Sequence, residues 1–163
     1  MEMHNELLVL LLRHHCQKFR DSCSPSLIEI MLKYYKLVPN EYYELQNKYK
    51  NENVGLIHFA GQTIEGLRIE RHIPGPGQSF VERVCEEWPK GNLIGLYCVI
   101  PEINKCHGWI VSGISGERIF LLSKYSEDGK GSGCETAYMD RSLYGEDAIQ
   151  ITDLIFGIPM GQQ

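Results

Sequence analysis

The chain has no apolar run long enough to cross a membrane. Its longest uninterrupted apolar run, residues 7–12, has six members, whereas a membrane-spanning helix needs about 20. The pattern of a secretory signal is missing as well, because Glu2 and Glu6 precede this run and the basic residues follow it. We therefore interpret residues 7–12 as a buried strand or helix, and we expect no membrane partner.

Positive charge is also scarce. The 16 lysines and arginines are outnumbered by 21 aspartates and glutamates, which leaves a formal net charge of −5, and the basic residues do not gather in a run. Binding to a phosphate backbone depends on a basic footprint. This balance argues against nucleic acid as the main partner.

Cysteine pairs with zinc-binding spacing are missing. The six cysteines have no regular spacing and form no C-x-x-C pair, which argues against structural zinc and against a disulfide-dense scaffold. A metal site made by Cys106 and His107 with Cys16 and His15 is disfavoured, because neighbouring residues of a strand point to opposite faces. His14 and His15 are instead expected at the surface or partly buried. We expect reduced thiols, no metal, no cofactor and a cytoplasmic location, which for an exported effector would be the cytoplasm of a host cell.

What the chain does have is the composition of an ordinary globular domain. Its 163 residues are 43% apolar and 23% charged, and no repeat of 20–50 residues is visible in the sequence. We therefore expect a single domain over residues 1–163.

Helical patterns dominate the first half of the chain. Residues 24–36 predict a helix that is buried on most sides, since Glu29 and Lys33 are its only charged interior positions. Asp21 or Ser22 can cap this helix at its N-terminus. Shorter helices are predicted over residues 40–50 and 78–88.

Strand patterns follow in the second half. Ser115-Gly116 predicts a hairpin turn, and residues 126–136 are polar and glycine-rich, which predicts a mobile loop. Helices followed by antiparallel strands define the α+β class, with two lobes packed on one core. The buried strands are predicted over residues 92–100, 107–114, 117–124 and 148–158.

Cys23 is the strongest candidate for a nucleophile. It stands at the start of the predicted buried helix, where unpaired N–H groups and the helix dipole favour an anion. A cysteine thiolate is such an anion, and cysteines in this position can have a pKa lowered from about 8.5 toward roughly 3.5–7.5. The position therefore predicts a thiol that is ionised near neutral pH.

Two further residues complete a candidate catalytic group. His107 opens a predicted strand after a polar loop, and an imidazolium beside Cys23 would stabilise the thiolate and protonate a leaving group. Gln17 precedes Cys23 by six residues, so its side-chain amide can join the Cys23 backbone N–H around a developing oxyanion.

These residues resemble the papain-like cysteine peptidases of the C39, bacteriocin-processing, type. Gln17-x5-Cys23 at a helix start is followed here by Ser-Pro-Ser and a helix ending in Tyr-Tyr. The family pattern is Gln-x5-Cys-Gly-Pro-Ala-Ser, a helix ending in Tyr-Tyr-Gly, and a histidine that opens a Val/Ile-rich strand, as His107 does 84 residues after Cys23. The resemblance covers roughly residues 10–125, and bacterial effector glutamine deamidases share the skeleton.

The resemblance implies a papain-like fold, with a helical lobe and an antiparallel sheet. It makes Cys23 the nucleophile, His107 the general base and Gln17 the oxyanion donor. The family's third catalytic residue is an aspartate, but this chain has Ser123 in that place, 16 residues after His107. A neutral hydroxyl stabilises an imidazolium less than a carboxylate does. Asp128, in the next loop, is the alternative candidate for that role.

Three functions remain open from the sequence. The first is a C39-like peptidase that hydrolyses an amide bond of a peptide or protein substrate. The second is a glutamine deamidase that uses the same machinery on a partner protein and releases ammonia. The third is a catalytically degenerate binding module with this fold, because the acidic residue is missing. The oligomeric state has no signature in the sequence.

Overall fold

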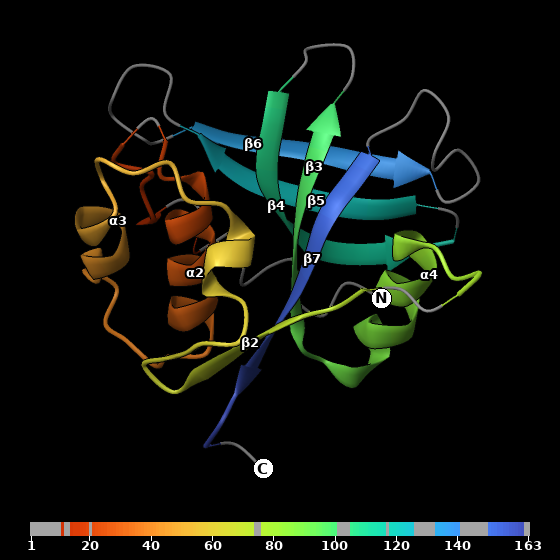
Figure 1. The fold of residues 1–163 in the computed structure, drawn as a ribbon, viewed down its shortest axis with the longest axis horizontal. Coiled ribbons are helices and arrows are strands. Elements are labelled where there is room, and N and C mark those ends of the chain that lie inside the picture. Colours follow the sequence, from red (N-terminus) through yellow and green to blue (C-terminus); the bar gives the residue numbers. More distant parts are fainter. Residues whose placement is uncertain are drawn as a thin grey trace.

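The protein is a seven-stranded antiparallel sheet with helices packed on it, as a computed structural model shows (Figure 1). Helices and strands occur together as the sequence predicts, so the mixed α+β class is confirmed. The structure describes residues 11, 14–19, 21–73, 76–100, 105–116, 118–125, 133–140 and 150–161.

The long buried helix of the first half is α2 (Cys23–Tyr34). Every residue from Ser24 to Lys33 is buried, which confirms the prediction of a helix covered on most sides. Pro25 lies in the first turn, where a missing N–H has no helical partner to lose. Ser22 is the N-cap residue as predicted, but its hydroxyl makes no capping bond to the helix. The helix is followed by Lys36, whose positive φ of 58° redirects the chain.

The second predicted helix is shorter than expected. α3 spans Glu44–Lys48, five residues, rather than residues 40–50. The two preceding tyrosines, Tyr42 and Tyr43, lie outside the helix: the Tyr42 ring is buried in the core beside α2, and the Tyr43 backbone at φ −141° is not helical. Packing of these rings therefore overrides the helical pattern of the sequence.

The third predicted helix is α4 (Phe80–Glu87), which continues into the 3-10 turn η2 (Trp88–Lys90). A capping box fixes its beginning: the Ser79 hydroxyl accepts from the Glu82 N–H at 3.1 Å, and the Glu82 carboxylate accepts from the Ser79 N–H at 3.4 Å. Gly91 ends the element with a left-handed φ of 84°.

The sheet has the order β1-β2-β7-β3-β4-β5-β6, and all of its pairs are antiparallel. The last strand along the chain, β7, therefore lies between β2 and β3. All four predicted strands are confirmed with small shifts of their ends. The strands are β1 (Thr63–Ile64), β2 (Leu67–Arg71), β3 (Leu93–Ile100), β4 (Lys105–Ser115), β5 (Arg118–Tyr125), β6 (Gly133–Asp140) and β7 (Gln150–Pro159).

Two parts of the sheet differ from the prediction. Residues 133–136, predicted as part of a loop, belong to β6, whose backbone pairs with β5 from Gly133↔Tyr125 onward. The β1–β2 hairpin was not predicted; it turns through Glu65 and Gly66, both with positive φ, as a two-residue hairpin requires. The predicted Ser115-Gly116 turn between β4 and β5 is confirmed.

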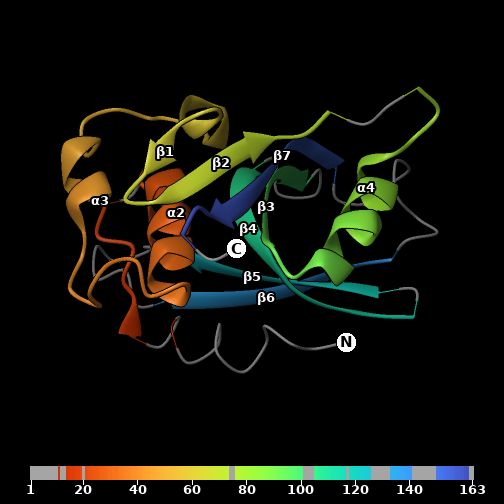
Figure 2. The ribbon, with the colours of Figure 1, turned by 90° about the horizontal axis from the view of Figure 1, so that it is seen from below.

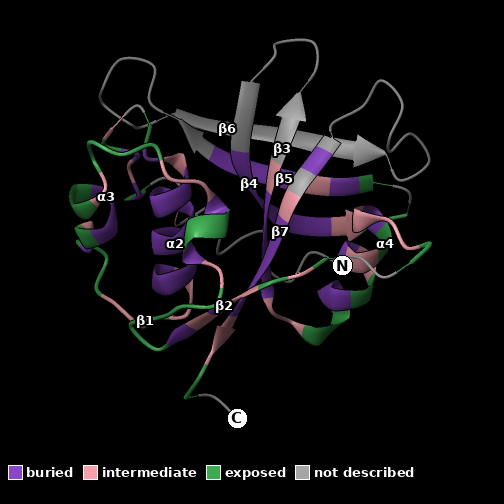
Figure 3. Ribbon diagram, viewed as in Figure 1, coloured by how far each residue is buried: buried purple, intermediate pink, exposed green. Residues whose placement is uncertain are grey.

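The sheet separates two apolar clusters. One contains residues of α2 with Leu93, Ile110 and Leu122, and the other contains residues of α4 with Ile94 and Val111. Because neighbouring residues of one strand feed different clusters, the clusters lie on opposite faces. This corrects the prediction of one shared core. Figure 2 shows α2 and α3 at one end of the sheet and α4 at the other, and Figure 3 shows the buried stretches along α2 and the central strands.

Within the described residues, no helix combines the length and the apolar character needed to cross a membrane. The apolar run at residues 7–12 lies outside the described residues except for Leu11, which is helical and half-buried.

Candidate active site

Cys23 is the first residue of α2 and lies against the sheet. A Cβ built on Gly108 of β4 would lie 3.9 Å from the Cys23 carbonyl oxygen and 3.8 Å from Leu27 of the same helix. The backbone of Gly108 also makes a hydrogen bond with the Cys23 thiol. The helix start and the strand therefore meet at a position one residue after His107, although 84 residues separate Cys23 from His107.

The ionisation of the Cys23 thiol is governed by two opposing effects. Burial raises the pKa of the thiol and is the larger effect. Polar contacts with the side chains of Ser24 and Tyr97 and with the backbone of Ser24 and Gly108 lower the pKa. The net direction is upward, so the lowered pKa expected from the helix terminus is wrong for the described surroundings of the thiol, because desolvation outweighs the donors.

His107 is placed by its backbone. In β4 it pairs with Cys98 of β3, and the next pair along the ladder is Gly108 with Tyr97. The side chain of His107 and all of Asp128 lie outside the described residues.

Gln17 is a buried residue of the segment 14–19, which runs toward α2. Its side chain is 2% exposed, and its Nε2 donates to the carbonyl oxygen of Phe19 at 3.1 Å. The amide is thus a fixed, buried group rather than a solvated one, as an oxyanion donor needs to be.

Gln46 of α3 holds the main chain on both sides of Gln17. Its Nε2 donates to the Cys16 carbonyl at 2.9 Å, and its Oε1 accepts from the Lys18 N–H at 2.7 Å. The same Oε1 accepts from the Ser22 hydroxyl at 2.8 Å. One buried amide therefore fixes the chain from position 16 to the N-cap of α2, a contact that the sequence analysis missed.

The carboxylate of Glu29 in α2 fixes the position of the Gln46 side-chain amide. This carboxylate accepts from Gln46 Nε2 at 2.7 Å and from the Leu45 N–H at 3.1 Å. Burial raises the pKa of Glu29 to about 7, although the bonds from Gln46 and the charge of Lys33 act against this shift. A helix interior, a second helix and the segment with Gln17 are thereby joined in one polar network.

Ser123 lies beside the backbone that follows His107. It is 1% exposed, and its hydroxyl donates to the Gly108 carbonyl at 2.6 Å. The predicted position of the third catalytic residue is therefore adjacent to the candidate site. The hydroxyl holds the main chain of β4, a role that the sequence analysis did not assign to it.

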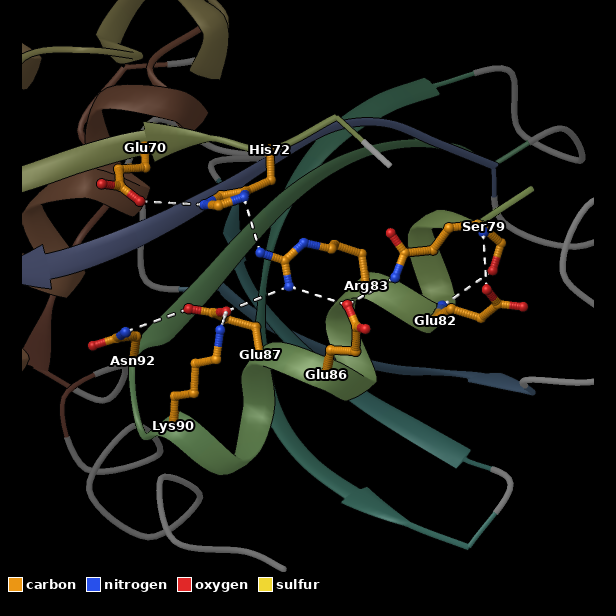
Figure 4. A network of polar contacts seen from close by, with 10 residues as sticks. Glu70, His72, Ser79, Glu82, Arg83, Glu86, Glu87, Lys90 and Asn92 are labelled. Atoms are coloured by element: carbon orange, nitrogen blue, oxygen red, sulfur yellow. Dashed lines mark hydrogen bonds and ion pairs between the residues drawn. The ribbon is translucent and has the colours of Figure 1, made fainter. Parts of the chain in front are cut away.

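A second polar network links β2 to α4 and carries no nucleophile (Figure 4). The ring of His72 stacks on Phe156 at 3.8 Å between centroids. Its Nδ1 lies 3.1 Å from Arg83 and its Nε2 lies 3.3 Å from Glu70. Since arginine only donates, His72 is the neutral tautomer with its proton on Nε2. Arg83 also pairs with the carboxylates of α4, so the network joins the end of β2 to a helix.

Metal-binding clusters are not found in the part of the chain that the structure describes: no group of three or more histidine, cysteine, aspartate and glutamate side chains there could hold an ion. Cys16, Cys23 and Cys85 are not in disulfide bonds.

Fold and site together define a mixed α+β protein with a thiol at the start of a buried helix, against a sheet strand. Comparison with models of known families, with curated proteins and with solved structures finds no match for the chain. The functional assignment therefore depends on the chemistry of the site.

Proposed function

We propose that the chain is a cysteine-dependent hydrolase of amide bonds in a peptide or protein, with a C39-like, papain-like site. The observation that supports this most directly is the hydrogen bond between the Cys23 thiol and the backbone of Gly108, directly after His107. Two segments that carry a nucleophile and a base thus converge, as nucleophilic catalysis requires.

The reaction assigns one role to each residue. The Cys23 sulfur bonds to the amide carbonyl carbon while its proton passes to His107, and Gln17 with the Cys23 N–H stabilises the oxyanion. The carbon–nitrogen bond then breaks, and the leaving amine or ammonia takes the proton from His107. Water then attacks the thioester carbonyl and gives a proton to His107. The carbon–sulfur bond breaks, the acid is released, and His107 returns the proton to the Cys23 sulfur.

The pH dependence of thiol alkylation tests the dyad. Burial alone raises the pKa of Cys23, so alkylation by iodoacetamide at about pH 6 should be slow without an imidazolium partner. We expect fast alkylation of Cys23 at this pH in the unmodified protein and slow alkylation in His107→Ala. Cys16 and Cys85 are internal controls whose rates should not change. Slow alkylation of Cys23 in both proteins would contradict the dyad.

The geometry can be tested without catalysis. Within the described part of β4, Gly108 and Ile110 face α2 while Trp109 and Val111 belong to the opposite cluster. The β3–β4 pairing has no register shift from Lys105 to Ile110, so the dyad requires a local change of twist before Gly108 rather than a bulge. A disulfide needs Cα atoms within about 7 Å. Since Cys98 lies directly opposite residue 107 in the ladder, the test uses a Cys98→Ser background. There we expect His107→Cys to form a disulfide with Cys23 under mild oxidation, whereas Ser115→Cys, at the far end of β4, should not. Absence of the first disulfide would overturn the pairing.

A degenerate binding module is the second candidate. It is favoured by the raised pKa of Cys23 and by the Ser123 hydroxyl, which donates to Gly108 rather than supplying a carboxylate. Peptide libraries analysed by mass spectrometry separate the outcomes. Two fragments indicate a peptidase, the small mass gain of an amide-to-acid conversion indicates a deamidase, and Cys23→Ala should abolish either product. Unchanged peptides would support the binding module.

A further inference from the structure

A cavity of about 480 Å³ lies at the carboxyl end of α2, where Lys33, Tyr34 and Lys36 form part of its lining. Leu11 and the histidines of the preceding segment, His14 and His15, complete that side. Lys33 is ten residues from Cys23, so at 1.5 Å per residue the helix separates them by about 15 Å. The cavity is therefore distinct from the candidate active site.

Lys33 is a buried cation, and within the described part of the chain no carboxylate lies at bonding distance from it. Its side chain is 4% exposed, and its Nζ donates to His15 Nδ1 at 2.9 Å and lies 3.8 Å from the centroid of the Tyr43 ring. Glu29, one turn earlier on α2, directs its carboxylate to Gln46 and the backbone of α3 instead. A buried charge is costly unless an opposite charge pairs with it.

The other polar groups of the cavity add positive charge or donors. Lys36 and His14 are exposed at its rim. His15 Nδ1 accepts a hydrogen bond from the Lys33 ammonium, so the ring proton of this neutral imidazole is on Nε2, which donates to the Ser26 hydroxyl at 2.8 Å. The lysines are not needed to cap α2, because its last carbonyls already accept main-chain N–H groups.

Burial lowers the pKa of Lys33 to about 8, while Glu29 and Glu41 act in the opposite direction from a longer range. The ammonium thus stays mainly protonated at neutral pH. No carboxylate lines the cavity among the described residues, so its positive charge is open to a ligand.

We propose that this cavity binds a small organic anion, with a carboxylate or phosphate group against Lys33 and Lys36 and an apolar body against Leu11 and Tyr34. The volume of about 480 Å³ falls within the range of small-molecule sites. Such an anion would supply a counter-charge that none of the described side chains places at bonding distance from Lys33. The same segment that borders the cavity at His14 and His15 continues to Gln17, so occupancy would stabilise the chain that leads to the candidate active site.

Calorimetric titration with phenyl phosphate, benzoate and neutral benzyl alcohol tests the proposal. We expect saturable binding of at least one anion and none of benzyl alcohol. Lys33→Met should weaken anion binding by about tenfold or more, because a buried charge partner is lost. Lys36→Ala should weaken it severalfold, whereas Lys50→Ala, an exposed residue outside the cavity lining with the same change of net charge, should leave it unchanged.

Substitutions at exposed positions keep the test usable if the buried variant misfolds. If Lys33→Met does not fold, Lys36→Ala and His14→Gln still report on the cavity. Tighter binding of phenyl phosphate assigns a phosphate ligand, and tighter binding of benzoate assigns a carboxylate. Absence of saturation with both anions, or equal losses in Lys36→Ala and Lys50→Ala, would overturn the proposal. Measurement in the Cys23→Ala background separates this result from any failure of the hydrolase assignment.

Discussion

At the residue scale, α2 packs closely on the sheet where it crosses the glycines Gly95 and Gly157. A Cβ built on Gly95 of β3 would lie 2.9 Å from Met31 Cε, 3.1 Å from Leu27 Cδ2 and 3.2 Å from Ile155 Cγ1. All three side chains are at least 98% buried. They have little room to yield, so the helix can approach the sheet this closely only because residue 95 has no side chain.

Gly95→Ala is therefore expected to lower the free energy of unfolding by about 1–3 kcal/mol, the usual cost of overpacking. Urea denaturation monitored by tryptophan fluorescence measures this change. Gly55→Ala is the matched control, because a Cβ there meets nothing within 4 Å. Equal stabilities of the two variants would show that the helix can move away from the sheet at no cost.

Glu29 makes a different residue-scale prediction. Its pKa is about 7 when folded, against 4.5 for an ordinary carboxyl, so the folded state binds the proton more tightly. The contribution of this pKa difference to the free energy of unfolding is about 3 kcal/mol. It is fully present below about pH 4.5 and is lost as pH rises through about 7. Denaturation at a series of pH values should show this loss in the unmodified protein and in Glu52→Gln, an exposed control. Glu29→Gln should lack it; an unchanged slope would contradict the assignment.

At the element scale, α3 is too short to be stable by itself and acts through one side chain. Its five residues fall well below the length at which isolated helices persist in water. Gln46 nonetheless makes four hydrogen bonds from its side chain, to Cys16, Lys18, Ser22 and Glu29. The element therefore serves to place this amide behind the segment with Gln17.

We expect Gln46→Ala to lower the free energy of unfolding by about 1–3 kcal/mol or more, because several buried groups lose their partner at once. Gln62→Ala removes a side chain of the same type whose single bond, to the His58 carbonyl, is exposed. The control should stay within about 0.5 kcal/mol of the unmodified protein. Both values follow from urea denaturation, and a Gln46→Ala variant as stable as the control would show that the segment does not depend on α3.

The elements that the sequence predicted well have strong local signals. α2 combines Pro25 in its first turn with a continuous apolar surface, and β3 is an apolar run, so both were located within a residue or two. The polar partners Glu29 and Gln46 gave no such signal, because their relation exists only after two helices pack. β2 was missed although Leu67 and Ile69 alternate with charged residues, because the adjoining β1 has only two residues.

At the scale of the whole molecule, a separate apolar cluster covers each face of the sheet. Polar contacts connect the helix of each cluster to strands of the sheet. On one side the Tyr35 hydroxyl accepts from the Leu93 N–H at 2.9 Å and donates to the Gly157 carbonyl at 3.2 Å, which fixes the end of α2 to β3 and β7. On the other side Arg83 and His72 join α4 to β2 across Phe156. The candidate site lies where α2 meets β4, so its geometry depends on the Tyr35 contacts that hold α2 against the sheet.

These two sides respond to pH in opposite directions. Burial and the charge of Arg83 lower the pKa of His72, while the contact with Glu70 acts against this shift. Because the folded protein binds this proton less tightly than the unfolded chain, the stability from His72 is present above its unfolded pKa of about 6.5 and is lost as pH falls through the lower folded value. Acid thus weakens the contact of β2 with α4 while it relieves the buried charge of Glu29.

The two effects can be separated by combining variants. In Glu29→Gln the alkaline loss of stability is removed, so denaturation at decreasing pH should reveal the loss due to His72 alone. Adding His72→Gln should remove this decrease in the free energy of unfolding at acid pH, because an amide keeps a donor and an acceptor but does not titrate. His14→Gln, an exposed control, should leave the decrease at acid pH unchanged. If the free energy of unfolding of Glu29→Gln/His72→Gln still decreases at acid pH, the decrease originates outside the network of β2 and α4.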